Sequence, residues 1–255
     1  MTVNISHPVW RYIPPITATG LTQMAIDTWL WQQQQQGGMT SCLRFYQWES
    51  AAISYGYHQK DLPAQWCTLA WGGKPLEIIK RPTGGRAVLH QGDLTYGIVT
   101  RMAAPRRRLA YETLCQFLIT GWGRLGLPLR LGSDLGHDQR TVNCFSRATT
   151  ADLVLPCPLS GGYKLIGSAQ AWSGLTVLQQ GSMRLWPDPN LWQQVFQAPL
   201  ILPNCQFPDT EIIISTLCQA LEDDLGISLV SEPLTPAEWQ AIKKIQNDPQ
   251  FTCSN

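Results

Sequence analysis

The sequence predicts an α+β domain in which a mixed or mostly antiparallel sheet is flanked by helices. Segments rich in β-branched and aromatic residues dominate the middle of the chain, whereas helical patterns dominate its two flanks. A chain of 255 residues with 44% hydrophobic content is also long enough to bury one sizeable core. These observations together define the predicted fold class.

The first predicted helix covers residues 19–38, where apolar residues recur at helical spacing and a glycine pair ends the pattern. The segments 42–48 and 51–57 follow, both rich in aromatic or β-branched residues. Because only two residues separate them, they predict a pair of antiparallel strands. Three further strands are predicted at 76–81, 87–90 and 94–100.

A second helix is predicted at 108–126, because its leucines follow a helical pattern that stops at Gly126. Strands are then predicted at 127–131, 151–155, 162–170 and 175–185. Three helices follow at 190–197, 209–226 and 235–246, the last with Thr235 as N-cap and Pro236 in its first turn. We therefore expect one domain over residues 1–255, with 186–255 as a mainly helical part packed on the rest.

The charge balance argues against some classes of partner. Nineteen Lys and Arg face eighteen Asp and Glu, so the formal net charge is only +1. This gives no electrostatic case for nucleic acid or for an anionic membrane surface. The first twelve residues lack a basic region followed by an apolar stretch, and no run of about 18 apolar residues occurs. We expect a cytoplasmic protein that binds neither nucleic acid nor membrane.

The cysteine spacing gives no metal or redox motif. None of the eight cysteines forms a C-x-x-C pair, so we expect no metal site. Most of them are interpreted as small buried hydrophobic residues. They stand at positions 42, 67, 115, 144, 157, 205, 218 and 253.

The segment "RPTGGRAVLHQGDLTYG", residues 81–97, places a glycine pair beside strand-like residues. Glycines in such a place cost chain entropy and indicate that a ligand or another backbone passes close. Their free amides can approach a carbonyl or an anion, and a flanking arginine supplies charge-assisted hydrogen bonds. The candidate binding residues here are Arg81, Thr83, Gly84, Gly85 and Arg86, and His90 is a candidate for catalysis.

A second candidate segment is "GGYKLIGSAQ". Lys164 precedes the small triplet Gly167, Ser168 and Ala169, which would let a ligand touch the backbone. Strand alternation predicts that Lys164 and Ile166 face one way and that Gly167 faces the other. Lys164 is therefore either a solvated charge or a residue that points into a cleft.

A third candidate is Cys144 in "NCFSRATTADLVL", twenty residues before Lys164. A nearby cation stabilises a thiolate, so a cysteine beside a lysine or histidine can lose its proton near neutral pH. Such a thiolate accepts acyl groups. The interpretation requires Cys144, Lys164 and His90 to converge in the fold.

These segments occur together in a known family. In order and approximate spacing, "FYQWESAAISYGYHQ", "RPTGGRAVLHQGDLTYGIV", "CFSRATTADLVL" and "KLIGSAQ…VLQQGSM" resemble the lipoate and biotin protein ligase catalytic domains, and most of all their octanoyl transferases. The resemblance covers roughly Trp29 to Arg184. The chain departs from the family pattern at Gly97, where a serine is usual, and at Trp172, where a basic residue often follows "SAQ".

The resemblance implies attachment of an octanoyl or lipoyl group to a lysine of a lipoyl-domain protein. It implies that the glycine loop and the strand of Lys164 line an acyl tunnel and that Cys144 is the nucleophile. His90 matches the histidine that follows the glycine loop in related transferases. The expected donor is a thioester on an acyl carrier protein, or the H protein of the glycine cleavage system.

The implied chemistry has two steps. Transfer of the acyl group to Cys144 exchanges one thioester for another, so we expect no ATP and no other cofactor. The attacking lysine has an ordinary pKa near 10.4, and its deprotonation at pH 7 costs about 4–5 kcal/mol. His90 or Lys164 is expected to remove or relay that proton. Lys164 and the amides around Gly167 and Ser168 are expected to stabilise the oxyanion.

Three alternatives stay open. An ATP-dependent lipoate–protein ligase has the same fold; the glycine loop and Lys164 would then bind an acyl-adenylate with ATP and Mg²⁺, and Cys144 would have no role. A biotin ligase fits less well, because an adenylate loop of the "GRGR" type is absent. A non-catalytic module that binds lipoyl domains or acyl carriers is the third. The basic run Arg106–Arg108 is a candidate docking surface for an acidic carrier.

Overall fold

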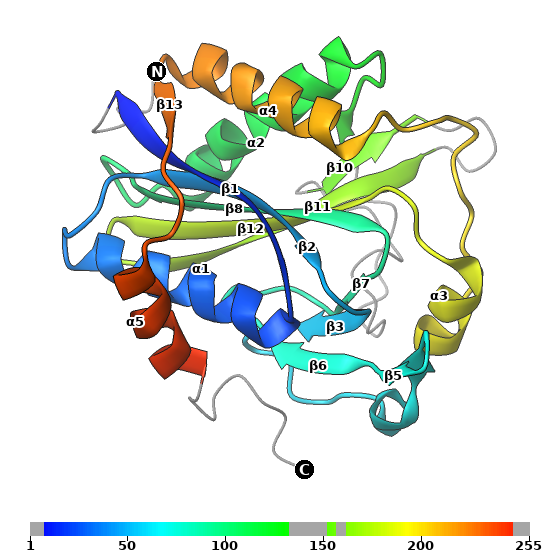
Figure 1. The fold of residues 1–255 in the computed structure, drawn as a ribbon. Helices are drawn as coiled ribbons and strands as arrows, with labels where there is room; N and C mark the ends of the chain where they lie inside the picture. The colour runs from blue at the N-terminus through cyan, green and yellow to red at the C-terminus, as the bar shows by residue number, and fades with distance from the viewer. Residues whose placement is uncertain (1–7, 133–151, 157–161, 247–255) are drawn as a thin grey trace.

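The computed structural model describes residues 8–132, 152–156 and 162–246. A mixed eight-stranded sheet lies at the centre, with helices on both faces (Figure 1). Across the sheet the strands are β13 (Ser228–Ser231), β1 (Val9–Ala18), β2 (Cys42–Trp48), β8 (Asp93–Arg101), β12 (Thr176–Arg184), β11 (Tyr163–Ser173), β10 (Asp152–Leu155) and β9 (Arg130–Leu131). Strand β1 is parallel to both its neighbours, and the other pairs are antiparallel. The predicted mixed sheet with flanking helices is confirmed.

One face of the sheet packs against α2 (Arg107–Arg124) and α4 (Thr210–Leu225). Because strand side chains alternate, Leu94, Tyr96 and Ile98 of β8 all point to this side. They join the largest core cluster together with residues such as Phe117 of α2 and Leu217 of α4. This face is a packed core.

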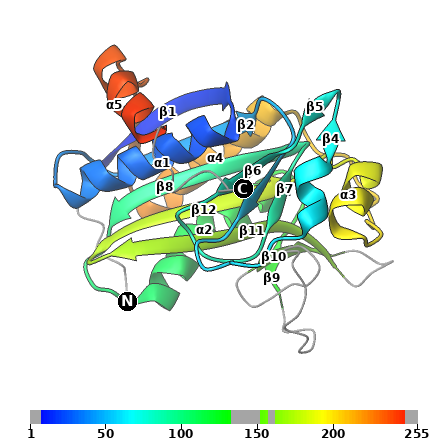
Figure 2. The ribbon, with the colours of Figure 1, turned by 90° about the horizontal axis from the view of Figure 1, so that it is seen from below.

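The opposite face packs against α1 (Gly20–Gln35) and α5 (Pro236–Gln246), as Figure 2 shows from below. Ile26 and Leu30 of α1 pack against Val99 and Leu178 of the sheet. Ile242 of α5 joins the same cluster. Helix α1 thus lies directly over β8 and β12, and it brings polar residues onto this face as well.

A second, three-stranded sheet lies beside the N-terminal start of α1, in the order β6 (Glu77–Lys80), β3 (Ala52–Tyr55), β7 (Val88–His90). It packs with η1 (Ala64–Thr68) and α3 (Pro189–Phe196), while β4 (Ala70–Trp71) and β5 (Lys74–Pro75) form a short hairpin. The predicted pairing of residues 42–48 with 51–57 is therefore wrong. Both edges of β2 are already occupied, by β1 and β8, so β3 pairs with β6 and β7 instead.

The residues after β12 return to the sheet. Strand β13 extends its edge beside β1, α4 covers α2, and α5 packs on α1. Neither β1 nor β13 was predicted. Within the described ranges, no helix is both long and apolar enough to cross a membrane.

An ion pair joins β1 to α5. Arg11 donates two hydrogen bonds to the carboxylate of Glu238, at 2.6 and 2.9 Å, and both side chains are largely buried. Glu238 also accepts from the backbone N–H of Thr235, and Thr235 Oγ1 accepts from the N–H of Glu238. This is a capping box that stabilises the start of α5. The hydrogen bonds from Arg11 lower the pKa of Glu238.

We predict that Glu238→Gln lowers the free energy of unfolding at pH 7 by about 1–2 kcal/mol. A carboxylate with a lowered folded-state pKa stabilises the fold above its unfolded pKa, near 4.3, and the contribution disappears as pH falls through the folded pKa. The difference from the wild type should therefore shrink below about pH 4 in urea titrations. Glu232→Gln is the control, because Glu232 lies 3.9 Å from Arg11 and is 61% exposed. An equal loss in both variants would contradict the prediction.

Candidate active site

A narrow cavity of about 60 Å³ lies between α1, the small sheet and the large sheet. Two rows of residues on neighbouring strands form its floor: Thr95, Ser182 and Gly167 in one row, and Gln180 and Ala169 in the next. Apart from Gln180, the side chains in these rows are small and leave room above the sheet. The other lining residues are Met24, Tyr46, Trp48, Ser54, Arg81, Gly85, Val88, His90, Ser168 and Gly181.

The sequence-predicted residues meet at this cavity to different degrees. Six of the candidates line it, namely Arg81, Gly85, His90, Gly167, Ser168 and Ala169. Gly84 lies instead on a neighbouring open groove. Thr83 is fully buried and donates to Gln180 at 2.8 Å, and Arg86 lines neither space.

Arg81 holds the glycine loop in shape. Its guanidinium donates to the carbonyls of Gly84 and Arg86, both at 2.7 Å, and to the carbonyl of Ser54 at 2.9 Å. Gly85 has φ +92°, a conformation that favours glycine. Gly56 supports the loop from below, since a Cβ there would lie 1.9 Å from the carbonyl oxygen of Gly85. Gly85 is thus explained by its backbone conformation and Gly56 by close backbone packing, whereas nothing lies within 4 Å of a Cβ at Gly84.

Lys164 points to the cavity side of the sheet, which corrects the predicted alternation. Leu153 pairs with Ile166 but Val154 pairs with Lys164, so Leu165 is an extra residue in β11. Such a bulge reverses the alternation on one side of it. The Lys164 side chain therefore shares the face of Gly167, whose Cβ position would lie 3.2 Å from Lys164 Cε.

The Lys164 ammonium forms an ion pair with Asp152 at 2.8 Å. Both side chains are buried, with 5% and 4% of the residue exposed. Asp152 pairs with Gly167 across the strands, so the charged pair lies beside the cavity floor. A buried cation at this point is suited to stabilise a developing oxyanion.

His90 is buried and hydrogen-bonded on both ring nitrogens. Nδ1 lies 2.7 Å from Asp93 Oδ2, and Nε2 lies 2.8 Å from Ser54 Oγ. The ring stacks on Trp48 with centroids 3.8 Å apart. Arg81 Nη1 lies 3.2 Å from Ser54 Oγ, and with Arg81 donating, the Ser54 hydroxyl is left to donate to His90. His90 thus contacts the cavity partly through Ser54.

Sequence reasoning missed a buried polar network beneath the glycine loop. Gln180 accepts from Thr83 and donates to Asp27 of α1 at 2.6 Å. Asp27 also accepts from Arg44 at 2.7 Å, and both of these charged side chains are 1% exposed. Gly97 lies between Arg44 and Gln180 in the strand register, and a Cβ there would lie 3.0 Å from Asp27 Oδ1. This contact explains the departure at Gly97.

Ser168 directs its side chain away from the cavity. Its hydroxyl hydrogen-bonds with Tyr96 at 2.8 Å, on the face that packs against α2. Only the backbone of Ser168 is therefore available to the cavity. The side chain of Ser168 positions the strand, and the small size of Gly167 and Ala169 leaves the cavity open.

Cys144 and Cys157 lie outside the described residues. Burial raises the pKa of Cys42 to about 12 and that of Cys115 to about 11, so these two thiols are poor nucleophiles at neutral pH. The described residues contain no group of three or more His, Cys, Asp or Glu arranged to hold a metal ion.

Comparison with known proteins identifies the family. The family described as the lipoyl protein ligase A/B catalytic domain matches residues 19–209. Octanoyltransferase LipM of Moorella thermoacetica is 34% identical over 183 residues, which cover 69% of this chain and 65% of the relative. Octanoyltransferase LipM of Carboxydothermus hydrogenoformans is 32% identical over 181 residues, covering 68% and 64%. The chain belongs to the lipoyl protein ligase A/B catalytic domain family.

Solved structures agree on the fold. A lipoate-protein ligase A bound with ATP has a TM-score of 0.76 at 17% identity, covering 94% of this chain and 95% of that chain. A bipartite lipoate protein ligase from Thermoplasma acidophilum, described with its E2 lipoyl domain, has a TM-score of 0.73 at 16% identity, covering 97% and 94%. The match to the two LipM relatives spans a little under two thirds of their length.

We predict that Gly56→Ala lowers the free energy of unfolding by about 1–3 kcal/mol, because its Cβ would overlap the backbone of the glycine loop. Urea denaturation measures the change. Gly123→Ala is the matched control, since nothing lies within 4 Å of a Cβ at that helical position. If Gly56→Ala is as stable as Gly123→Ala, the loop does not rest on Gly56 as described.

Proposed function

We propose that this chain is an octanoyltransferase of protein lipoylation. It moves an octanoyl group from a carrier-protein thioester to Cys144 and then to a lysine of a lipoyl domain. The buried Lys164–Asp152 pair beside the cavity floor carries the proposal, because a fixed cation next to the cavity supports stabilisation of an oxyanion formed there. The names of the LipM relatives support the same activity.

In the first step the Cys144 thiolate attacks the thioester carbonyl, forming a new C–S bond. The oxyanion collapses, the donor C–S bond breaks, and the donor thiolate takes up a proton. In the second step the neutral amine of the acceptor lysine attacks the Cys144 thioester, and the cysteine thiolate leaves. The Lys164 ammonium stabilises both oxyanions and lowers the thiol pKa. No ATP and no cofactor enter either step.

His90 acts in this scheme as a proton relay. Asp93 orients the imidazole through Nδ1, and the proton of the attacking amine passes to Nε2 by way of the Ser54 hydroxyl. Because His90 is also packed on Trp48 and 3% exposed, its replacement will affect stability as well as rate.

The octanoyl tail enters this cavity, which has to widen from its volume of about 60 Å³ to hold the whole tail. Met24, Tyr46, Trp48 and Val88 supply apolar wall, and each buried methylene contributes roughly 0.8 kcal/mol. Chain-length selection is therefore graded. The proposed donor is an acyl carrier protein thioester or the octanoylated glycine cleavage H protein, from which a C–N bond would break and a lysine amine would leave in place of the thiolate. The acceptor is a lipoyl-domain protein, and the reaction takes place in the cytoplasm without nucleic acid or membrane.

We predict that incubation with an octanoyl carrier-protein thioester, without ATP, adds one octanoyl group to the peptide "VNCFSR". The adduct should be labile to hydroxylamine and detectable by mass spectrometry, because it is a thioester. Cys144→Ser should reduce transfer about a thousandfold or more, since a serine hydroxyl is not ionised at pH 7.

Cys157→Ser is the control for Cys144→Ser and should retain activity. Loss of transfer in Cys157→Ser with activity retained in Cys144→Ser would assign the nucleophile to Cys157. An active Cys144→Ser enzyme that requires ATP and free octanoate would instead establish the ligase alternative. Absence of transfer under both conditions would favour the binding module.

We predict that Lys164→Met raises the pKa of the Cys144 thiol and lowers turnover by about a hundredfold or more, because it removes the cation. The alkylation rate of Cys144 against pH measures the first effect, and its profile should move to higher pH. Lys243→Met, at an exposed position of α5, is the control. An unmoved profile in a folded Lys164→Met protein would remove Lys164 from the thiol's environment.

A further inference from the structure

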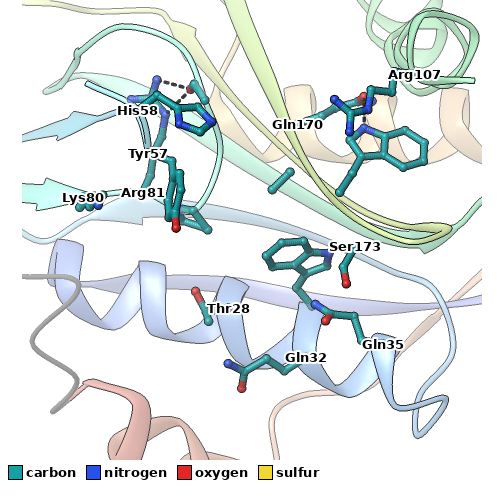
Figure 3. A pocket seen from close by; sticks show the side chains of 15 residues that line it. Thr28, Gln32, Gln35, Tyr57, His58, Lys80, Arg81, Arg107, Gln170 and Ser173 are labelled. Carbon is teal, nitrogen blue, oxygen red and sulfur yellow. Dashed lines mark hydrogen bonds between the residues drawn. The ribbon is translucent and has the colours of Figure 1, made fainter. Parts of the chain in front are cut away.

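A large open groove adjoins the cavity and is not used by the chemistry described above. It has a volume of about 660 Å³ and lies between α1, the glycine loop and the end of β11. Arg81 lines both spaces, so the groove and the cavity meet at the glycine loop. Figure 3 shows Thr28 rising from α1 between Tyr57 and Arg81 on one side and Gln170 and Arg107 on the other.

The groove has an unbalanced positive charge. Lys80, Arg81 and Arg107 line it together with His58, and none of the described residues lining it is Asp or Glu. The protein as a whole is nearly neutral, at +1, so this is a local feature. A site with such a lining favours an anionic ligand, because neighbouring cations raise its local concentration.

Two residues that line the groove, Thr28 and Trp31, each carry a buried polar atom without a partner in the described part of the chain. The Thr28 hydroxyl and the Trp31 indole N–H are buried, and neither has a hydrogen-bond partner among the described residues. Thr28 is only 6% exposed. Buried polar groups in folded proteins are nearly always hydrogen-bonded, so a ligand toward which these two side chains turn would supply partners that they lack.

The remaining wall offers amides and aromatic rings. Gln32 and Gln35 present side-chain amides, which both donate and accept, whereas the Gln170 amide is held by Gln179 and Trp172. Trp172 is fixed in the wall by a hydrogen bond from its Nε1 to Gln170 Oε1 at 2.9 Å. This gives a role to the tryptophan at which the chain departs from the family pattern. The lining thus fits a flexible ligand that carries amide groups and a negative charge.

We infer that the groove binds the phosphopantetheine arm of the thioester donor. This inference rests on the proposed function and names the donor class. The arm carries two amides that can bind the side chains of Gln32, Gln35, Thr28 and Trp31, and a phosphodiester that can bind Arg107. With the arm in the groove, the thioester lies at the glycine loop beside Ala169, and the acyl tail enters the cavity.

The test uses two analogues in which an amide replaces the octanoyl thioester, so that no transfer occurs. One is octanoyl-phosphopantetheine amide and the other lacks its phosphate. Titration calorimetry should show that the wild type binds the phosphorylated analogue about tenfold more tightly, equivalent to about 1.4 kcal/mol. Arg107→Ala should abolish this preference. Thr28→Val should weaken both analogues, because it removes a hydroxyl while keeping the shape.

Arg108→Ala is the matched control. Arg108 neighbours Arg107 but pairs with Glu112 at 2.8 Å and does not line the groove, so both affinities should stay unchanged. Equal affinity of the wild type for the two analogues would overturn the inference, as would equal effects of Arg107→Ala and Arg108→Ala. Tighter binding of ATP than of the phosphorylated analogue would also overturn it.

Competition with carrier proteins tests whether the groove binds the phosphopantetheine arm or an acidic surface of the carrier protein. A holo carrier should displace the phosphorylated analogue, and an apo carrier, which lacks the arm, should not. Equal displacement by both would overturn the inference. Because binding is measured without transfer, analogue binding in a protein that shows no transfer would contradict only the proposed function. Transfer without the phosphate preference would contradict only the groove assignment.

Discussion

The Asp27 carboxylate, buried over Gly97, is the contact on which the arrangement of the site depends. It comes from α1 and lies above three adjacent strands of the sheet, where Arg44 and Gln180 flank the glycine. Burying this charge is costly unless it is paired and hydrogen-bonded, and Arg44 and Gln180 supply that compensation. Gln180 in turn accepts a hydrogen bond from Thr83 and so fixes the position of the glycine loop. These contacts fix the distances between α1, the large sheet and the glycine loop, and the cavity is the space left between the three.

The bulge at Leu165 has a comparable effect at the other side of the cavity. Without it, the Lys164 side chain would point with Ile166 into the apolar core under α2 and α4. One additional residue in β11 turns the ammonium to the face of Gly167 and Asp152. Leu165 and Ile166 both remain in the core cluster, so the core loses no apolar contact. A local irregularity of the strand therefore places a charge beside the cavity at little cost to packing.

Much of the fold follows from the sequence, since the periodicity of apolar residues and the glycines at segment ends locate α1, α2, α4 and most central strands. Which strands pair with each other was harder to predict from the sequence. The two residues between β2 and β3 resemble a hairpin turn, but β2 is enclosed by β1 and β8, strands that come from distant parts of the chain. Strand β1 lacks alternation in its sequence, and its stability comes from partners on both sides. Such partners are tertiary information that a local pattern does not contain.

The candidate site was predictable in its residue types and less so in their orientation. Glycines beside an arginine and a histidine indicated a binding loop, but the same donors that suit an anion also suit backbone carbonyls, which is where Arg81 directs hydrogen bonds. The orientation of Lys164 depends on a bulge, and the sequence of β11 gives no signal for that bulge. The Asp27 network was missed because its members, on α1 and three strands, lie far apart in the chain. The one local signal for it was Gly97, where the family usually has a side chain.

Arg81 links the two spaces that the reaction is proposed to use. Its guanidinium holds the carbonyls of Gly84 and Arg86, and the same side chain lines the cavity and the groove. The glycine loop is therefore a shared wall, with an apolar interior on one side and a cationic, amide-rich surface on the other. Because one guanidinium holds the loop between the two spaces, a change in the shape of the loop toward one space also alters its shape toward the other. In the proposed reaction, recognition of the acyl tail and of the donor arm are consequently coupled through the loop and are not two independent selections.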